Sequence, residues 1–289
     1  MAQKKIAILI SGENRLNFLS NDLNNNIQIE NYNKYIFTNE FKEKYDYDVF
    51  ISTDNINFQN AKNYFGENNL KNIHLTTLEN DIYYMNNIHK YIKSFDYYRN
   101  FYFFYDHKDY KRFDKVVYEH YRLYDLYNLL DNYSSIENYD YIIRFRIDVF
   151  FNYNLDIYLE RLNNNNDIHI FAEVNIFTIG RSLVSKKILQ IVSLEKLYNK
   201  HLYNIYYNFS LNSESIVEPE FFYCNNVEHQ KRYSYCAELQ FVECLFEYCV
   251  ENNLDIDKAI KSFTSINEQR ICKVHIFDNI NNNYYIKQW

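Results

Sequence analysis

The sequence predicts an α/β fold with a mainly parallel central sheet flanked by helices. Two patterns indicate this class. The chain opens with a short continuous apolar run, Lys4–Ile10, followed by a glycine turn, which is typical of a buried parallel strand that begins an α/β unit. Further on, a helical pattern at Asp109–Asp131 leads through a short polar link into an apolar strand at Tyr139–Phe150, as in a strand–helix–strand crossover.

The other elements follow from apolar runs and from helical spacing. We expect strands at Tyr47–Thr53, Asn72–Thr76, Asp167–Phe171, Val174–Ile179 and Ile271–Phe277, and helices from Leu16 and at Phe58–Phe65, Leu78–Ser94, Leu155–Leu162, Ser182–Leu197 and Tyr233–Val250. The chain contains no internal repeat and no linker rich in Pro, Gly or Ser, so we expect a single domain over residues 1–289.

Composition narrows the classes of protein to consider. Of the 289 residues, 47% are hydrophobic, which is enough to build a large core. The net charge of −7 disfavours a general nucleic-acid binder, which would more often be basic. No apolar run reaches the ~18 residues of a membrane span, and the first run is too short for a signal peptide, so we expect a cytoplasmic protein. The cysteines show no C-x-x-C spacing, so we expect reduced thiols rather than a zinc site.

The strand Tyr139–Phe150 carries charges that need a physical reason. Alternation along a strand places Ile142, Arg144, Arg146 and Asp148 on one face, while the other face is apolar. A buried charge costs several kcal/mol, roughly, unless it is paired or bound to a ligand. Two interpretations are open: an internal Arg–Asp ion pair that fixes the strand, or a site where arginines bind phosphate and the carboxylate binds a hard cation.

The stretch Tyr-Asp-Tyr-Ile-Ile-Arg-x-Arg-x-Asp at residues 139–148 resembles the YDyviR-x-R-x-D signature of a group of glycosyltransferase-like proteins. These occur in polysaccharide-synthesis clusters and large DNA viruses, and are similar to GT-A-fold nucleotide-sugar transferases. The resemblance implies a GT-A-like fold with a nucleotide-binding half at residues 1–150 and an acceptor-side half at residues 151–289. It also implies that Asp148 acts as the last Asp of an Asp-x-Asp motif, holding Mn²⁺ or Mg²⁺ on a diphosphate.

Two strand ends near the amino terminus carry candidate cofactor contacts. Ser11, Gly12 and Arg15 form either a plain turn or a phosphate-binding turn at a helix start, and the related proteins open with a similar strand-Ser-Gly-x-x-Arg stretch. Asp54 follows the second strand, where it either caps the next helix or contacts the base or ribose of a nucleotide, as a similar segment in the group implies. Arg122, off the apolar stripe of the long helix, joins these candidates together with Arg144 and Arg146.

Two candidates lie in the last third of the chain. Glu238, at the start of a predicted helix, is either a first-turn Glu that the helix dipole stabilises or a general base acting on an acceptor hydroxyl. His275 is either a core histidine of the final strand or, as the resemblance implies, a second metal ligand beside Asp148.

The resemblance implies transfer of a sugar from a nucleotide-sugar donor to a glycan or protein acceptor, with catalysis by Glu238 and Asp148. If the protein is viral, the location would be the host cytoplasm. A non-catalytic protein that uses a degenerate transferase fold for binding or structure is the competing class, because Arg146-Ile147-Asp148 lacks the first Asp of Asp-x-Asp. Retention or inversion of configuration and the oligomeric state are left open.

Overall fold

The computed structural model describes residues 3–20, 27–88, 110–151, 154–173, 176–191, 237–262, 272–278 and 283–287. The chain divides into two compact units. The first unit comprises residues 1–76, 125–186 and 260–289, and the second comprises residues 77–124 and 187–259. Each unit therefore draws on residues from both sides of position 150.

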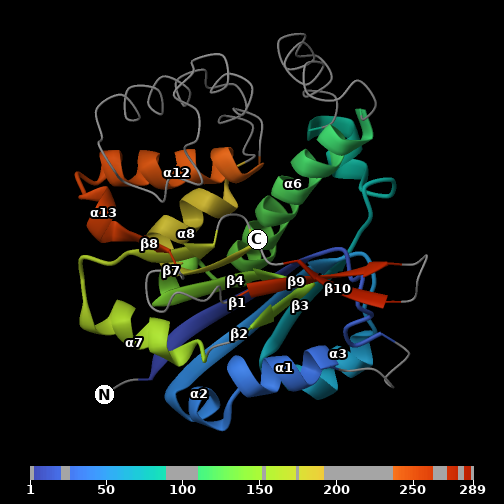
Figure 1. Ribbon diagram of the computed structural model, residues 1–289, viewed down its shortest axis with the longest axis horizontal. Coiled ribbons are helices and arrows are strands. Elements are labelled where there is room, and N and C mark those ends of the chain that lie inside the picture. Colours follow the sequence, from blue (N-terminus) through green and yellow to red (C-terminus); the bar gives the residue numbers. More distant parts are fainter. Residues whose placement is uncertain are drawn as a thin grey trace. The chain divides into compact units, whose positions relative to one another are not determined.

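A seven-stranded sheet forms the centre of the first unit (Figure 1). In sheet order its strands are β3 (Leu70–Leu75), β2 (Tyr45–Thr53), β1 (Lys4–Gly12), β4 (Tyr141–Arg146), β7 (Phe177–Arg181), β6 (Ile170–Glu173) and β8 (Ile260–Ser262). The first four are parallel to one another, β7 is antiparallel to both of its neighbours, and β6 is parallel to β8. The predicted α/β class with a mostly parallel sheet is therefore confirmed.

The order of the strands marks one position at the carboxyl edge of this sheet. From β1 the chain builds outward through β2 to β3, and it then returns to place β4 on the other side of β1. The gap between the ends of β1 and β4 is thus a topological switch point, which is where open α/β sheets bind ligands.

Four helices of the first unit are α1 (Ile27–Tyr35), α2 (Asn39–Lys44), α3 (Phe58–Phe65) and α7 (Asp156–Asn164). Alternation along β1 points Ile6, Ile8 and Ile10 into the core beneath these helices. Tyr32 of α1 packs edge-on against Phe18 and Phe145, with ring centroids 5.1 and 5.3 Å apart. The aromatic-rich composition thus fills this core with interlocking rings.

The end of the long helix α6 (Tyr110–Tyr133) packs on the opposite face of the sheet, where the ring of Tyr133 lies 5.8 Å from that of Phe50 on β2. A 3₁₀ turn, η2 (Ile136–Asn138), then leads into β4. The predicted crossover from a long helix into the charged strand is therefore present.

A second, three-stranded sheet in the first unit consists of β5 (Val149–Phe151), β9 (Cys272–Asp278) and β10 (Asn283–Lys287). Both of its pairings are antiparallel. The chain passes from β4 in the main sheet into β5 through only Ile147 and Asp148. This short connection places Asp148 between the two sheets.

The second unit is helical in its described parts. It contains η1 (Tyr84–Ile88), a π-helix, with the first part of α6, the end of α8 (Ser182–Leu189), α12 (Ala237–Glu251) and α13 (Ile256–Ala259). Tyr84 packs against Tyr118 and Tyr121 of α6, with ring centroids 5.0 and 5.5 Å apart. Among the described residues of either unit, no helix is long and apolar enough to cross a membrane.

The expected helix from Leu16 is wrong. Residues 15–20 form turns, and Asn17 and Leu19 have positive φ values of 54° and 52°. The side chain of Asn14 explains the bend, because it accepts from the Phe18 N–H at 2.7 Å and donates to the Phe18 carbonyl at 2.8 Å. Such local side-chain bonds compete with helix formation. Within the described part of the chain, the first helix is α1, at Ile27–Tyr35.

Candidate functional site

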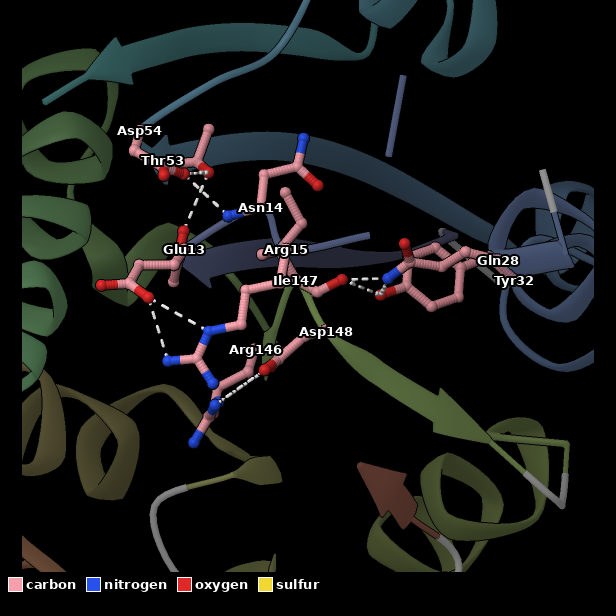
Figure 2. Close-up of polar contacts among 11 residues, drawn as sticks. Glu13, Asn14, Arg15, Gln28, Tyr32, Thr53, Asp54, Arg146, Ile147 and Asp148 are labelled. Carbon is pink, nitrogen blue, oxygen red and sulfur yellow. Dashed lines mark hydrogen bonds and ion pairs between the residues drawn. The ribbon is translucent and has the colours of Figure 1, made fainter. Parts of the chain in front are cut away.

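The carboxyl ends of β1, β2 and β4 are tied together at the switch point (Figure 2). The Ile147 N–H, just past β4, donates to the Ser11 carbonyl at 2.7 Å. The Thr53 hydroxyl at the end of β2 donates to the Gly12 carbonyl at 2.8 Å. Three of the predicted strand-end segments therefore meet at one edge of the sheet.

The turn after β1 depends on a glycine. Gly12 has φ +123°, a conformation that side chains rarely adopt, so a Cβ here would strain the backbone. Beyond it, the guanidinium of Arg15 bonds Glu13 Oε2 through Nε at 3.1 Å and Nη2 at 3.0 Å. Both side chains are about half exposed, so this ion pair contributes at most ~1 kcal/mol and is easily exchanged for a ligand.

Asp54 holds the β1 turn rather than a helix. Its Oδ1 accepts from the Asn14 N–H at 2.7 Å, and the Thr53 hydroxyl, whose proton goes to the Gly12 carbonyl, lies 3.2 Å from the same oxygen. The cap of α3 is Asn57, whose side chain accepts from the Asn60 N–H at 2.9 Å. The capping alternative for Asp54 is therefore wrong, because the chain runs three further residues before α3 begins. The nucleotide-contact alternative stays a prediction.

Arg146 and Asp148 form a two-pronged ion pair. Nε of Arg146 donates to Oδ1 of Asp148 at 2.9 Å and Nη2 donates to Oδ2 at 2.8 Å. The Asp148 side chain is only 2% exposed, whereas that of Arg146 is 21% exposed. The ion-pair interpretation of this strand end is thus present in the structure, and the arginine is the partner that reaches the surface.

The backbone of Ile147, between Arg146 and Asp148, is held by two side chains of helix α1. The Ile147 carbonyl accepts from the Tyr32 hydroxyl at 3.0 Å and from the Gln28 amide, both on α1 (Figure 2). Gln28 and Tyr32 are themselves buried and joined by a 2.9 Å hydrogen bond. Helix α1 therefore sets the position at which Asp148 leaves the main sheet.

The two remaining arginine candidates are buried. Arg144 is 1% exposed and pairs across the sheet with Leu9 on β1 and Thr178 on β7. It shares a face of β4 with Arg146, as alternation predicts. Arg122 belongs to the second unit, where its guanidinium carbon lies 5.0 Å from the centre of the Tyr118 ring. The structure thus gathers Ser11, Gly12, Arg15, Asp54, Arg144, Arg146 and Asp148 in the first unit and places Arg122 in the second.

The second sheet brings β9 next to the segment that follows Asp148. Val149 on β5 is opposite Val274 on β9, so Asp148 directly precedes and His275 directly follows the members of this pair. The side chain of His275 lies outside the described part of the structure. Among the side chains that are described, no group of three or more His, Cys, Asp or Glu could hold a metal ion.

Glu238 is the second residue of α12 (Ala237–Glu251), and residues 192–236, which precede this helix, lie outside the described part of the chain. Its side chain also lies outside the described residues, so its assignment as a base stays a prediction. In their described parts, the expected strand at residues 271–277 and helix at residues 233–250 correspond to β9 and α12, while residues 233–236 and 271 lie outside the described chain.

Sequence reasoning missed two polar side chains at this edge. Asn14 is 6% exposed and organises the turn after β1, and an Asn in a predicted turn does not by itself signal that role. His74 on β3 lies 2.7 Å from Asp125 on α6, through Nδ1 and Oδ2. No local pattern signals that pair, because the two residues are 51 positions apart and meet only in the fold.

The fold and the edge together define an α/β protein with charged and polar groups at the switch point of a mostly parallel sheet. No protein-family profile matches the chain, and no curated protein sequence is significantly similar to it.

Proposed function

We propose that the protein is a GT-A-like glycosyltransferase that moves a sugar from a nucleotide-sugar donor to an acceptor hydroxyl. The observation that carries the proposal is the meeting of the β1 turn, Asp54 and the Arg146–Asp148 pair at the switch point. The motif at residues 139–148, which supplies that pair, adds the resemblance to nucleotide-sugar transferases.

The diphosphate is the part of the donor that this edge suits best. Arg15 is half-exposed and Arg146 is one-fifth exposed. Both guanidiniums therefore already reach the surface, where an anion can bind them. Arginine presents a planar fork of N–H donors that matches phosphate oxygens. Asp54 uses Oδ1 to hold the turn, and its second oxygen suits a hydroxyl of the ribose or an N–H of the base.

Asp148 and His275 suit Mn²⁺ or Mg²⁺ as a sparse pair of ligands. A carboxylate is a hard donor, and these ions keep several water or phosphate oxygens when a protein offers only one or two groups. When bound, such an ion would supply positive charge for the departing diphosphate. Since both oxygens of Asp148 already accept from Arg146, the arginine must share or release the carboxylate for the ion to bind.

The acceptor side of the reaction rests on Glu238. A Glu at the start of α12 would take the proton of the attacking hydroxyl if the reaction inverts configuration. Glu238→Gln keeps the shape but cannot accept that proton, so it would slow transfer by roughly 100- to 10,000-fold with donor affinity nearly unchanged. Weakened donor binding in this variant would instead show that Glu238 holds the sugar.

Calorimetric titration with nucleoside diphosphates and sugar nucleotides, with and without Mn²⁺, tests the proposal. We expect at least one nucleotide to bind, and Arg15→Ala to weaken it about tenfold, because a hydrogen bond to a charged group is lost. Lys44→Ala is the matched control, since Lys44 also makes an exposed ion pair but lies at the other end of β2, with Glu40 and Glu160. Failure of the whole panel to bind would refute the proposed function.

A non-catalytic nucleotide-binding protein is the second candidate. The observation that favours it is the Arg146–Asp148 pair itself, which occupies both oxygens of the expected metal ligand. Release of nucleoside diphosphate from the sugar nucleotide separates the two functions. An enzyme releases it in the presence of an acceptor or of water, whereas a binding protein returns the donor intact.

A further inference from the structure

A histidine–aspartate pair lies at the carboxyl edge of the sheet, away from the residues assigned above. Nδ1 of His74, on β3, lies 2.7 Å from Oδ2 of Asp125, on α6. Because a carboxylate can only accept, the Nδ1–H donates to it, and this fixes the tautomer and the orientation of the ring. The Asp125 side chain is 10% exposed and that of His74 is 41% exposed, so the aspartate is the buried support and the histidine faces the surface.

The register places this histidine level with the diphosphate end of the proposed site. His74 pairs with Ser52 on β2, Ser52 pairs with Ser11 on β1, and Ser11 pairs with Arg146 on β4. In-register residues of parallel strands share a face, so the four form one row across the carboxyl edge. Three strand spacings put His74 about 14 Å from the β4 position. That separation is on the scale of a nucleoside diphosphate laid across the strand ends.

The residues around His74 suit the nucleoside part of such a ligand. Asp54, the proposed ribose or base contact, follows β2, which is the strand next to β3. Leu75, the residue after His74, points to the other face of β3 by alternation, so the groups that share this end with the His74 ring are polar. A nucleobase has a polar edge of N–H and carbonyl groups, so His74 and Asp54 match its chemistry.

We propose that His74, held by Asp125, recognises the base of the nucleotide. In the tautomer that Asp125 imposes, a hydrogen bond from His74 to a ligand is made through Nε2, which accepts when the ring is neutral. The partner is then a base that presents a ring N–H on its polar edge, as uracil, thymine and guanine do and adenine and cytosine do not. Asp125 is a positioning residue, because it acts only through His74. This assignment rests on the proposed function, since it identifies which end of the donor lies over β3.

The test compares base selectivity with affinity for the phosphates alone. Titrations use the diphosphates of uridine, thymidine, guanosine, adenosine and cytidine, with inorganic pyrophosphate as the ligand that has no base. We expect the wild type to prefer the first three. His74→Ala should weaken those three about tenfold, the value of one hydrogen bond, and leave pyrophosphate binding unchanged. His74→Asn is the second variant, because it retains a polar group if the alanine variant does not fold.

Two further variants distinguish a direct contact from a general effect. Asn72→Ala changes an exposed residue on the same face of β3, two positions further from the edge, so it should leave selectivity unchanged. Asp125→Asn should reduce the preference for bases with a ring N–H, but it should have no further effect on selectivity when combined with His74→Ala. Independent effects of the two changes would overturn the positioning assignment.

The outcomes separate the two proposals. A wild type that binds no nucleotide refutes the proposed function and this inference with it. A wild type that binds nucleotides without base preference, or a His74→Ala variant that keeps the preference, refutes only the inference. Equal weakening of all nucleotides and of pyrophosphate would place His74 at the phosphates and would also overturn it.

Discussion

The Arg146–Asp148 pair gives the most quantitative prediction, because its two members differ in burial. Arg146→Met keeps the apolar stem but leaves a carboxylate that is 2% exposed without its two charge-assisted bonds. Removing one partner of a buried pair costs ~3–5 kcal/mol. Asp148→Asn leaves a guanidinium that is 21% exposed and can turn toward water, so we expect a smaller loss of about 1–3 kcal/mol.

Urea unfolding of the two single variants and of the double variant measures these free energies. We expect the Arg146→Met variant to be the less stable of the two. The double variant buries no unpaired charge, so its loss should fall short of the sum of the single losses by about 2 kcal/mol. Additive losses, or a larger loss in Asp148→Asn, would contradict the pairing and its burial.

Titration of the same variants with Mn²⁺ shows whether Asp148 is a metal ligand or only a structural ion-pair partner. If Asp148 is a metal ligand, Asp148→Asn abolishes binding of Mn²⁺ in the presence of a nucleoside diphosphate. Arg146→Met retains it, because that change frees both carboxylate oxygens. If Asp148 only anchors the strand end, both variants lose stability while the response to Mn²⁺ stays that of the wild type.

Three further predictions concern the backbone and the core. Gly12→Ala should cost about 1–3 kcal/mol in urea unfolding and weaken nucleotide binding as well, because the residue at φ +123° shapes the site; an unchanged affinity would separate the turn from the ligand. Gly180→Ala should cost about 1–3 kcal/mol, since the added Cβ would lie 2.9 Å from Ile170 Cγ1 and 3.0 Å from Ser185 Oγ; a neutral result would show that these side chains move aside. Burial raises the pKa of Asp156 above its ordinary value of 3.8, so its contribution to stability is fully present below about pH 4 and is lost as the pH rises through the higher pKa of the folded state. Asp156→Asn should therefore raise the melting temperature at pH 7, and this gain should disappear below about pH 4, as thermal unfolding at the two pH values will show.

The main sheet could be predicted from the sequence because its strands are continuous apolar runs. The runs at residues 4–10, 47–53 and 139–150 became β1, β2, and β4 with β5. The last of these divides because Ile147 and Asp148 form a turn, which alternation alone does not indicate. The helix expected from Leu16 failed because Asn14 bonds the Phe18 backbone on both sides, and a side chain that replaces helical bonds has no signature in hydrophobic spacing.

The candidate site was predictable only in part, for a related reason. Residues at strand ends, such as Gly12, Asp54 and Asp148, can be identified because the ends of apolar runs are visible in the sequence. Their partners come from elsewhere in the chain: Asn14 reaches Asp54 across 40 positions, and Asp125 reaches His74 across 51. Such contacts depend on strand order and helix placement, which the fold supplies and local patterns do not.

The strand ends at the switch point are joined largely through main-chain atoms. The Ile147 N–H bonds the Ser11 carbonyl, the Ile147 carbonyl receives the two α1 side chains, and Thr53 bonds the Gly12 carbonyl. None of these bonds uses the side chain of residue 11, 15 or 147. Of these three residues only Arg15 is exposed, because Ser11 and Ile147 are buried. Mutations at position 15 would therefore alter what the edge binds while leaving its frame in place, so a library randomised there is a suitable starting point for directed evolution of new ligand preferences.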